Sequence, residues 1–339
     1  MRQYRLAVIG ATGAVGKVFL DIMERRSFPL ASLKLYASQR SAGSRIRFRG
    51  EDLQVELTTP RCVEGADIVF ISATDAISKE YAPIAAKAGA VAIDDSGVWR
   101  MDTNVPLVIP EVNAHHLVKE RRIVSIPNCS TTPLAMTLAA LSTPANPAKR
   151  VVVSTYQSVS GTGSAAMREL QEQTRQVLSG ATGVRGEVYP HPIGFNLIPH
   201  IGSFKEEGYT SEEWKVASET RKILDRPDLA VCATTVRVPV FIAHSESVNA
   251  EFAQPIDPAT ARARLKAFAG VELVDDPATN GYPHPLLAAG KDPVYVGRVR
   301  RDMSHPSGLA YWLVSDNLRK GAALNAIQIA EAMIAKDLV

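Results

Sequence analysis

The chain has 339 residues, of which 46% are hydrophobic and 22% charged, and its formal net charge is +3. This length predicts two domains, the composition is typical of an ordered globular protein, and the absence of a long basic run removes the electrostatic case for a nucleic-acid or membrane partner. Three scattered cysteines, no paired metal-ligand spacing, no signal-peptide pattern and no apolar run of about 18 residues together predict a cytoplasmic protein without a metal site.

The N-terminal segment has the pattern of a dinucleotide site. Residues 4–9 predict a short apolar strand, Gly10 to Gly16 follow with G-x-x-G-x-x-G spacing, and an amphipathic helix is expected through about Arg26. Glycines allow the backbone to approach a pyrophosphate, whose charge the helix N-terminus favours. A glycine-rich turn also occurs between strands and helices without a ligand, so both interpretations stay open here.

The end of the next strand bears on the choice of cofactor. Residues 33–37 predict this strand, and an NAD site usually carries Asp or Glu at its end to bind the ribose 2′-hydroxyl. Here the chain reads Ser38-Gln39-Arg40-Ser41 instead. An arginine flanked by hydroxyl groups suits a 2′-phosphate, which predicts NADP; the alternative is a solvated surface turn.

The remaining elements change character along the chain. Strands at 68–71 and 91–93, with a helix near 77–88 between them, predict βαβ units in a parallel sheet. A mixed or antiparallel second domain is expected from strands at 150–154, 234–242, 247–251, 294–300 and 310–314, with helices near 164–178, 211–224 and 257–268. The last helix, about 321–335, has one apolar face and should pack back against the first domain.

A cysteine lies where a strand meets a helix. Residues 122–126 are rich in β-branched side chains and 134–141 are apolar at helical spacing, while Ser130 to Thr132 are good caps and Pro133 suits a first turn. Cys129 would then lie just before a helix N-terminus, where backbone N–H groups and the helix dipole favour the thiolate and so a nucleophile. The alternative is a small buried packing residue.

Several charged residues have both a chemical and a structural interpretation. Arg237 and His244 are seven residues apart and would face opposite sides of one strand, so a shared site requires the strand to end or bulge between them. Without further information, the sequence around Arg237 and His244 favours a structural interpretation, with an exposed arginine and a hydrogen-bonded histidine. Glu219 and Lys222 share a helix face, which favours a solvated ion pair, and Thr210 with Glu213 could form a capping box that starts this helix. Arg100 follows a predicted parallel strand, at the edge where α/β sheets bind ligands.

Taken together, these segments resemble the aspartate-β-semialdehyde dehydrogenase family over nearly the whole chain. The resemblance is carried by the glycine loop, by Pro127-Asn128-Cys129-Ser130-Thr131, and by four further segments at residues 154–161, 189–196, 237–246 and 316–323. Several of the motifs are individually weak, but in this order they are strongly specific.

The resemblance implies a Rossmann-type NADP-binding domain, residues 1–128 plus 317–339, and an α+β catalytic and dimerisation domain with a mixed sheet, residues 129–316. It implies oxidation of L-aspartate 4-semialdehyde with NADP and phosphate to L-4-aspartyl phosphate, in lysine, methionine and threonine biosynthesis, by a homodimer or homotetramer. Cys129 matches the nucleophile, His244 the acid/base that removes the hydroxyl proton, and Gln157 the residue that orients the acyl group. The remaining matches are to substrate-binding positions, Arg237, Glu219, Arg100, Asn128, Lys222 and Ser160, and to cofactor-binding positions, Gly10, Thr12, Gly13, Ala14, Val15, Ser38, Arg40, Ser41, Gly161 and Asn317.

The sequence departs from the family pattern in two places. Asp94-Asp95-Ser96 stands where Asn-Ser-Ser is more usual, and Ser72-Ala73-Thr74 replaces a Ser-Ala-Gly run. The related N-acetyl-γ-glutamyl-phosphate reductases typically have Gly-Cys-Tyr at the cysteine, and a malonyl-CoA reductase would not need Glu219 and Arg237 for an amino-acid substrate. A catalytically silent paralogue that acts as a binding protein is the alternative from another class.

Overall fold

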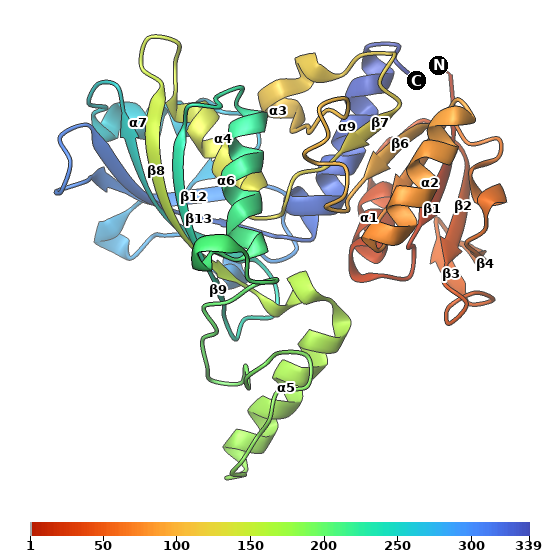
Figure 1. Cartoon of the computed structure of the whole chain (residues 1–339), viewed down its shortest axis with the longest axis horizontal. Coiled ribbons are helices and arrows are strands. Elements are labelled where there is room, and N and C mark those ends of the chain that lie inside the picture. The colour runs from red at the N-terminus through yellow and green to blue at the C-terminus, as the bar shows by residue number, and fades with distance from the viewer. Residues whose placement is uncertain (1) are drawn as a thin grey trace. The chain divides into compact units, whose positions relative to one another are not determined.

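The computed structural model describes residues 2–339, which form two compact units (Figure 1). The first contains the chain up to Pro127 together with Ala322–Val339, and the second is Asn128–Gly321. The chain thus crosses between units after Pro127 and after Gly321, whereas the sequence placed the crossings after residues 128 and 316.

A seven-stranded sheet forms the centre of the first unit. Its order is β3-β4-β2-β1-β5-β6-β7, and all neighbours are parallel except β3 and β4. Side chains alternate, so Leu6 and Val8 belong to the core on one face while Ala7 and Ile9 belong to the core on the other. The predicted parallel sheet is confirmed, with strands β1 (Tyr4–Ile9), β2 (Leu30–Ala37), β3 (Arg45–Phe48), β4 (Glu51–Leu57), β5 (Ile68–Ile71), β6 (Val91–Asp94) and β7 (Ile123–Ser125).

Helices cover both faces of this sheet. On one face α1 (Ala14–Arg25) packs with α9 (Leu324–Ala335), and on the other α2 (Asp75–Lys87) packs with the short turn η1 (Pro60–Val63). The apolar face of α9 lies in the first core, which confirms the predicted return of the last helix. Short helices α3 (Pro110–Asn113) and η2 (Ala114–His116) precede β7, and the π-helical turn η6 (Arg319–Ala323) leads into α9.

The second unit is built on a six-stranded mixed sheet of order β11-β12-β13-β10-β8-β9. The two outer pairs, β11 with β12 and β8 with β9, are parallel, and the other neighbours are antiparallel. This confirms the predicted mixed domain. The strands are β8 (Ala148–Gln157), β9 (Ala230–Arg237), β10 (His244–Phe252), β11 (Val271–Leu273), β12 (Val294–Arg301) and β13 (Gly308–Ser315).

Three helices pack with this sheet, namely α4 (Thr131–Leu141), α6 (Ser211–Ile223) and α7 (Pro258–Ala267). Helix α5 (Ser164–Leu178) projects from the sheet, as Figure 1 shows. The remaining short elements are η3 (Val159–Thr162), η4 (Glu206–Gly208), η5 (Pro277–Thr279) and α8 (Pro285–Ala288).

The strand predicted over residues 234–242 is wrong in its second half. β9 ends at Arg237, and a tight turn follows in which the Val240 N–H donates to the Val238 carbonyl at 2.8 Å. Pro239 has no N–H to donate to a sheet, and β9 is an edge strand, so the chain leaves the sheet there. β10 then begins at His244, and the break reorients the chain between Arg237 and His244.

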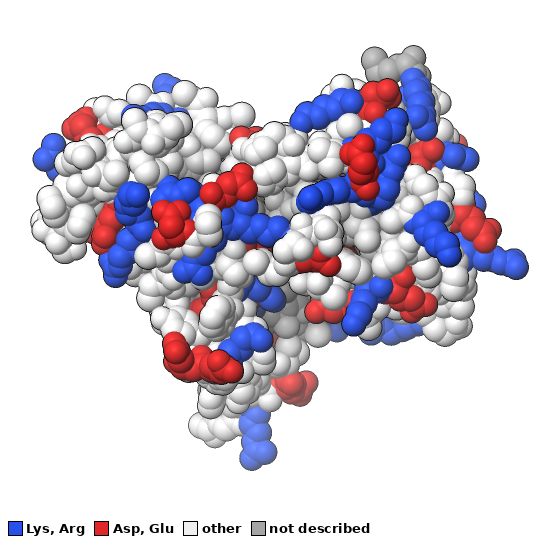
Figure 2. Space-filling model, turned by 45° about the horizontal axis from the view of Figure 1, so that its top comes forward, with Lys and Arg blue, Asp and Glu red and all other residues white. Residues whose placement is uncertain are grey.

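Among residues 2–339, none of the helices combines the length and the apolar character that crossing a bilayer requires. On the face of the molecule in Figure 2, Lys and Arg side chains are interspersed with Asp and Glu side chains rather than forming one continuous basic stripe.

Candidate active site

Cys129 lies two residues ahead of α4, as the sequence predicts, and is half-buried. The helix is not capped by the side chain of its N-cap residue Ser130. Instead, Asn128 Oδ1 accepts hydrogen bonds from the Ser130 N–H at 2.9 Å and the Thr131 N–H at 3.3 Å. Asn128 therefore starts the helix, and Cys129 is held beside its positive end.

Two buried glutamates of α6 hold Asn128 in turn. Glu219 Oε2 accepts the Asn128 backbone N–H at 2.7 Å, and Glu212 Oε1 accepts Asn128 Nδ2 at 2.8 Å. Glu219 is only 1% exposed, so the solvated ion pair favoured for Glu219 and Lys222 is wrong. Lys222 itself is half-buried. The capping box that starts α6, Thr210 with Glu213, is confirmed.

Gln157 reaches the same place from the end of β8. Its Nε2 donates to Ser130 Oγ at 2.8 Å and lies 3.3 Å from Glu212 Oε1. The sheet register pairs Gln157 with Arg237 on β9. Gln157 thus connects the residue that follows Cys129 with the strand that carries the arginine.

The break between β9 and β10 brings Arg237 and His244 together. Arg237 Nη1 donates to the Ser158 carbonyl at 2.6 Å, and the Ser158 N–H donates to His244 Nδ1 at 3.0 Å. A Cβ added to Gly161 would lie 3.3 Å from both Arg237 Nη1 and His244 Nε2. Arg237 is buried rather than exposed, which corrects the interpretation that the residues alone favoured.

Burial and the Arg237 guanidinium lower the pKa of His244 well below its usual range, and a backbone contribution from Ala243 acts in the opposite direction. The imidazole is therefore neutral near pH 7. A neutral imidazole can hydrogen-bond a substrate oxygen without adding charge to a site that already holds a guanidinium.

Asn317, two residues after the end of β13, forms hydrogen bonds with residues around His244. Its Oδ1 accepts the Ala243 N–H at 3.1 Å and lies 3.1 Å from the hydroxyl oxygens of Ser158 and Ser160. Asn317, Ser160 and Gly161 are thus part of the histidine cluster in the second unit. Their predicted contacts, with the cofactor for Asn317 and Gly161 and with the substrate for Ser160, stay predictions.

The glycine loop of the first unit is shaped for close approach. Gly10 has φ +91°, and a Cβ there would lie 2.0 Å from the Ser72 carbonyl oxygen, while a Cβ on Gly16 would lie 2.3 Å from the Gly10 oxygen. No other residue type fits either position without rearrangement. α1 begins after Gly13 with no side-chain cap, and Thr12, Ala14 and Val15 line the same turn. These features fit a dinucleotide pyrophosphate.

The residues expected at a 2′-phosphate follow the neighbouring strand. β1 and β2 are parallel and adjacent, so the glycine loop and the Ser38–Ser41 turn follow the same ends of both strands. Ser38 and Arg40 are exposed and Ser41 is half-buried, and the Ser41 N–H closes the turn on the Ser38 carbonyl at 2.9 Å. The turn leaves the guanidinium accessible to an anion.

The unusual loop after β6 is held by its own acidic residues. Buried Asp94 accepts the Ser96 N–H at 3.0 Å and the Ser96 hydroxyl at 2.6 Å. Asp95 accepts the Ser72 hydroxyl at 3.0 Å, and its carbonyl accepts Arg100 Nη2 at 2.9 Å. Burial raises the pKa of Asp95 to about 7. Arg100 belongs to the first unit, so its predicted role beside Asn128 and Lys222 of the second unit stays a prediction.

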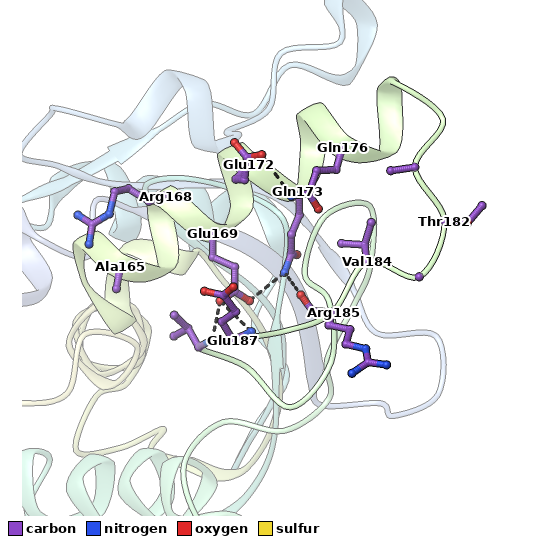
Figure 3. Close-up of a pocket in the computed structure, with 13 residues that line it drawn as sticks. Ala165, Arg168, Glu169, Glu172, Gln173, Gln176, Thr182, Val184, Arg185 and Glu187 are labelled. Atoms are coloured by element: carbon purple, nitrogen blue, oxygen red, sulfur yellow. Dashed lines mark hydrogen bonds between the residues drawn. The ribbon is translucent and has the colours of Figure 1, made fainter.

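A separate cavity of about 450 Å³ lies between α5 and residues 181–188 (Figure 3). Two of its polar side chains hold that segment: Glu169 Oε2 accepts the Glu187 N–H at 3.2 Å, and Gln173 Nε2 donates to the Arg185 carbonyl at 3.0 Å. It contains none of the predicted site residues.

Sequence reasoning missed Glu212, Ser158 and Gly321. A glutamate in the first turn of a helix, such as Glu212, is ordinarily a residue that complements the helix dipole. Ser158 acts through its backbone N–H, which no side-chain pattern reports. Gly321 leaves room for Cys129 because it has no side chain: a Cβ at this position would lie 2.9 Å from Cys129 Cβ.

The two units and their site define a semialdehyde dehydrogenase. The family model described as "Semialdehyde dehydrogenase, NAD binding domain" matches residues 5–120, and "Semialdehyde dehydrogenase, dimerisation domain" matches residues 138–320.

Individual relatives identify the family within this class more closely. The aspartate-semialdehyde dehydrogenase of Aquifex aeolicus is 47% identical, covering 99% of both chains, and that of Bacillus subtilis is 44% identical, covering 100% of this chain and 99% of the other. The crystal structure of aspartate semialdehyde dehydrogenase II from Vibrio cholerae complexed with ASA superposes with a TM-score of 0.94 at 41% identity, covering 99% of each chain. The chain belongs to the aspartate-semialdehyde dehydrogenase family, whose members are oxidoreductases of amino-acid biosynthesis.

Proposed function

We infer that this chain oxidises L-aspartate 4-semialdehyde with NADP and phosphate, giving L-4-aspartyl phosphate through a thioester on Cys129. One observation carries the proposal. The two neighbours of Cys129 are bound by Glu219 and Gln157, and the Gln157–Ser158 pair in turn meets Arg237 and His244. A nucleophile, a carboxylate, a guanidinium and an imidazole are thereby gathered from separate elements of one unit.

The residue types fit the two charged groups of an amino-acid substrate. The Arg237 guanidinium can grip a carboxylate through two parallel hydrogen bonds, and the buried carboxylate of Glu219 suits an ammonium group. Gln157 and Ser160 are proposed to bind the acyl oxygen and the substrate. The relative from Vibrio cholerae that was crystallised with ASA supports this substrate class.

The chemistry at the carbonyl carbon needs a nucleophile and an oxygen partner. The thiolate of Cys129 adds to the aldehyde carbon and the oxygen takes up a proton, which gives a hemithioacetal. His244 is proposed to remove that hydroxyl proton as the hydride leaves the carbon. NADP, when bound, supplies the acceptor for the hydride. Phosphate then attacks the thioester, and its charge is proposed to be held by Lys222, Asn128 and Arg100. Cys129→Ser should abolish turnover while NADP binding is retained.

The fit of the glycine loop to a pyrophosphate supports a dinucleotide, and Arg40 supports NADP over NAD. A hydrogen bond to a charged group is worth about 1.5 to 3 kcal/mol, or roughly tenfold to 150-fold in affinity. Arg40→Ala should therefore raise the KM for NADP by about tenfold or more and leave the KM for NAD nearly unchanged. Equal losses for both cofactors would refute the assignment.

The most informative experiment compares substrates. Purified protein is assayed for NADP reduction with L-aspartate semialdehyde, with and without phosphate, and with N-acetylglutamate semialdehyde; malonyl-CoA is tested with NADPH. Activity only with L-aspartate semialdehyde and phosphate is the expected result. Activity only with N-acetylglutamate semialdehyde or only with malonyl-CoA would identify the chain as the corresponding reductase. A protein that binds NADP but converts none of the substrates would be a catalytically silent paralogue.

The proposal includes self-association through the second unit, to a homodimer or homotetramer. The face of the six-stranded sheet that carries Tyr156 and Trp312, whose rings lie 5.4 Å apart, is half-buried and combines these two rings with Val152, Ser154 and Ser247. The match to a dimerisation domain supports a second copy as its occupant. Light scattering of the wild-type protein and of a Trp312→Asp variant tests this: we expect a dimer or tetramer that the variant weakens.

A further inference from the structure

The guanidinium of Arg237 makes a single hydrogen bond to the residues that the structure describes. Its Nη1 donates to the Ser158 carbonyl at 2.6 Å, and its Nε is buried without a partner among residues 2–339. A planar group that is held at one nitrogen can still turn about that bond. Because a carboxylate is gripped by two parallel N–H groups, the orientation of this plane decides whether both hydrogen bonds can form.

The aromatic ring of Tyr189 faces this guanidinium. Arg237 Cζ lies over the ring at 5.7 Å from its centroid, within the roughly 6 Å at which a guanidinium is attracted to an aromatic face. Arg237 is 5% exposed and Tyr189 is half-buried, so the contact is largely shielded from water. Stacking on a ring restricts the rotation that a single hydrogen bond leaves open.

The Tyr189 ring is itself held in place. Its hydroxyl group donates to Thr162 Oγ1 at 2.9 Å. The ring packs against the apolar cluster that includes Val159 and Leu170. Because both the polar tip and the apolar body of the side chain are engaged, the ring offers the guanidinium a surface of fixed orientation.

The chain on both sides of Tyr189 is anchored by α5. Before it, Gln173 Nε2 donates to the Arg185 carbonyl at 3.0 Å, as Figure 3 shows. After it, Gln173 Oε1 accepts the Ile193 N–H at 2.8 Å. Ile198 then exchanges two backbone hydrogen bonds, of 2.8 Å and 3.0 Å, with the last residue of β9. The segment that carries the ring is therefore tied both to α5 and to the strand end that carries the guanidinium.

We propose that Tyr189 is a positioning residue for substrate binding, whose ring holds the plane of the Arg237 guanidinium so that two N–H groups meet the carboxylate of the semialdehyde. The proposal rests on the proposed function, which assigns that carboxylate to Arg237. The polar contacts between α5 and residues 181–194 then serve to hold the ring. Because Tyr189 acts through the binding group and not on the reacting carbon, its effect belongs to the KM for the semialdehyde.

The first test separates substrate binding from turnover. Tyr189→Leu removes the ring and should raise the KM for L-aspartate semialdehyde about 3- to 30-fold, with kcat within about twofold of wild type and unchanged KM values for phosphate and NADP. Tyr189→Phe keeps the aromatic face, so its KM should stay within about twofold of wild type. An unchanged KM in Tyr189→Leu would overturn the proposal, and equal increases in both variants would assign the effect to the hydroxyl and refute the role of the ring.

Met167→Ala is the matched control, because Met167 packs against the same apolar cluster as Tyr189. This variant should lower the thermal stability while the KM for the semialdehyde is kept. If Met167→Ala raised that KM as much as Tyr189→Leu does, the ring would act through packing of the cluster alone, which contradicts the proposal.

The contact itself can be observed without turnover. In protein labelled with ¹⁵N at arginine, the Nε–H signal of Arg237 is assigned by NMR from its loss in Arg237→Lys. Protons over the face of an aromatic ring are shielded, so this signal should move downfield in Tyr189→Leu and stay near its wild-type position in Tyr189→Phe. A signal that does not move in Tyr189→Leu would overturn the proposal. If the signal behaves as expected but the wild-type protein does not convert the semialdehyde, the proposed function fails separately.

Discussion

Replacing Gly321 by alanine should displace the nucleophile without changing any group that reacts. Gly321 lies in η6, and an ideal Cβ there would lie 2.9 Å from Cys129 Cβ, 3.1 Å from its Cα and 3.2 Å from its carbonyl oxygen. Carbon atoms pack best at about 3.5 to 4.0 Å, so relief of this contact requires a movement of roughly 0.5 to 1 Å. Because Asn128 is held by Glu219 and Glu212, that movement falls on Cys129.

A misplacement of about 1 Å in a reacting group can cost about 100-fold in rate. We therefore expect Gly321→Ala to lower kcat by about 10- to 100-fold, to slow alkylation of Cys129 by iodoacetamide, and to leave NADP binding intact. Overpacking itself should cost about 1 to 3 kcal/mol of stability.

A matched control is available in Gly194→Ala, whose Cβ would lie 3.0 Å from Gln173 Cβ beside α5. That variant introduces a similar clash in the same unit, so its loss of stability should be similar while kcat is kept. A folded Gly321→Ala protein with kcat within about twofold of wild type would refute the reasoning, because a twofold change is less than about 0.5 kcal/mol in the barrier.

Three further predictions concern charged groups. Arg237→Lys should raise the KM for the semialdehyde by roughly tenfold or more, with a smaller effect on kcat, because lysine cannot form the paired hydrogen bonds to a carboxylate; an unchanged KM would contradict this. Asp95 becomes negatively charged above its pKa of about 7, and this charge should weaken phosphate binding by Arg100. The KM for phosphate of the wild type, divided by that of Asp95→Asn, should therefore increase severalfold from pH 6 to pH 8. A ratio that stays constant over this range would contradict the prediction. Burial raises the pKa of Glu246 well above 4.5, so the folded state holds a proton that the unfolded state releases, and wild-type stability should fall as pH rises above 4.5 by up to about 1.4 kcal/mol per unit. Glu246→Gln should make that slope smaller, while buried Asp95, whose pKa is also raised, keeps part of it; thermal unfolding of both proteins between pH 5 and pH 8 measures the difference, and equal slopes would contradict the prediction.

The sequence predicts the elements better than the polar contacts. The position of Cys129 before α4 follows from local patterns, since β-branched residues, caps and a proline all act within one short stretch. The burial of Glu219 and Arg237 does not follow from such patterns. It depends on which face of α6 meets the sheet and on a strand that ends at Arg237, and both are decided by tertiary packing.

The central claim is the thioester on Cys129, and a single turnover without phosphate tests it most directly. Enzyme, NADP and L-aspartate semialdehyde are mixed without phosphate, NADPH is followed by absorbance, and the quenched protein is digested for mass spectrometry. The account predicts a burst of NADPH equal to the number of active sites, an acyl group on the Cys129 peptide, and its release when phosphate is added. A steady phosphate-independent rate without a burst, or an acyl group on another residue, would contradict it.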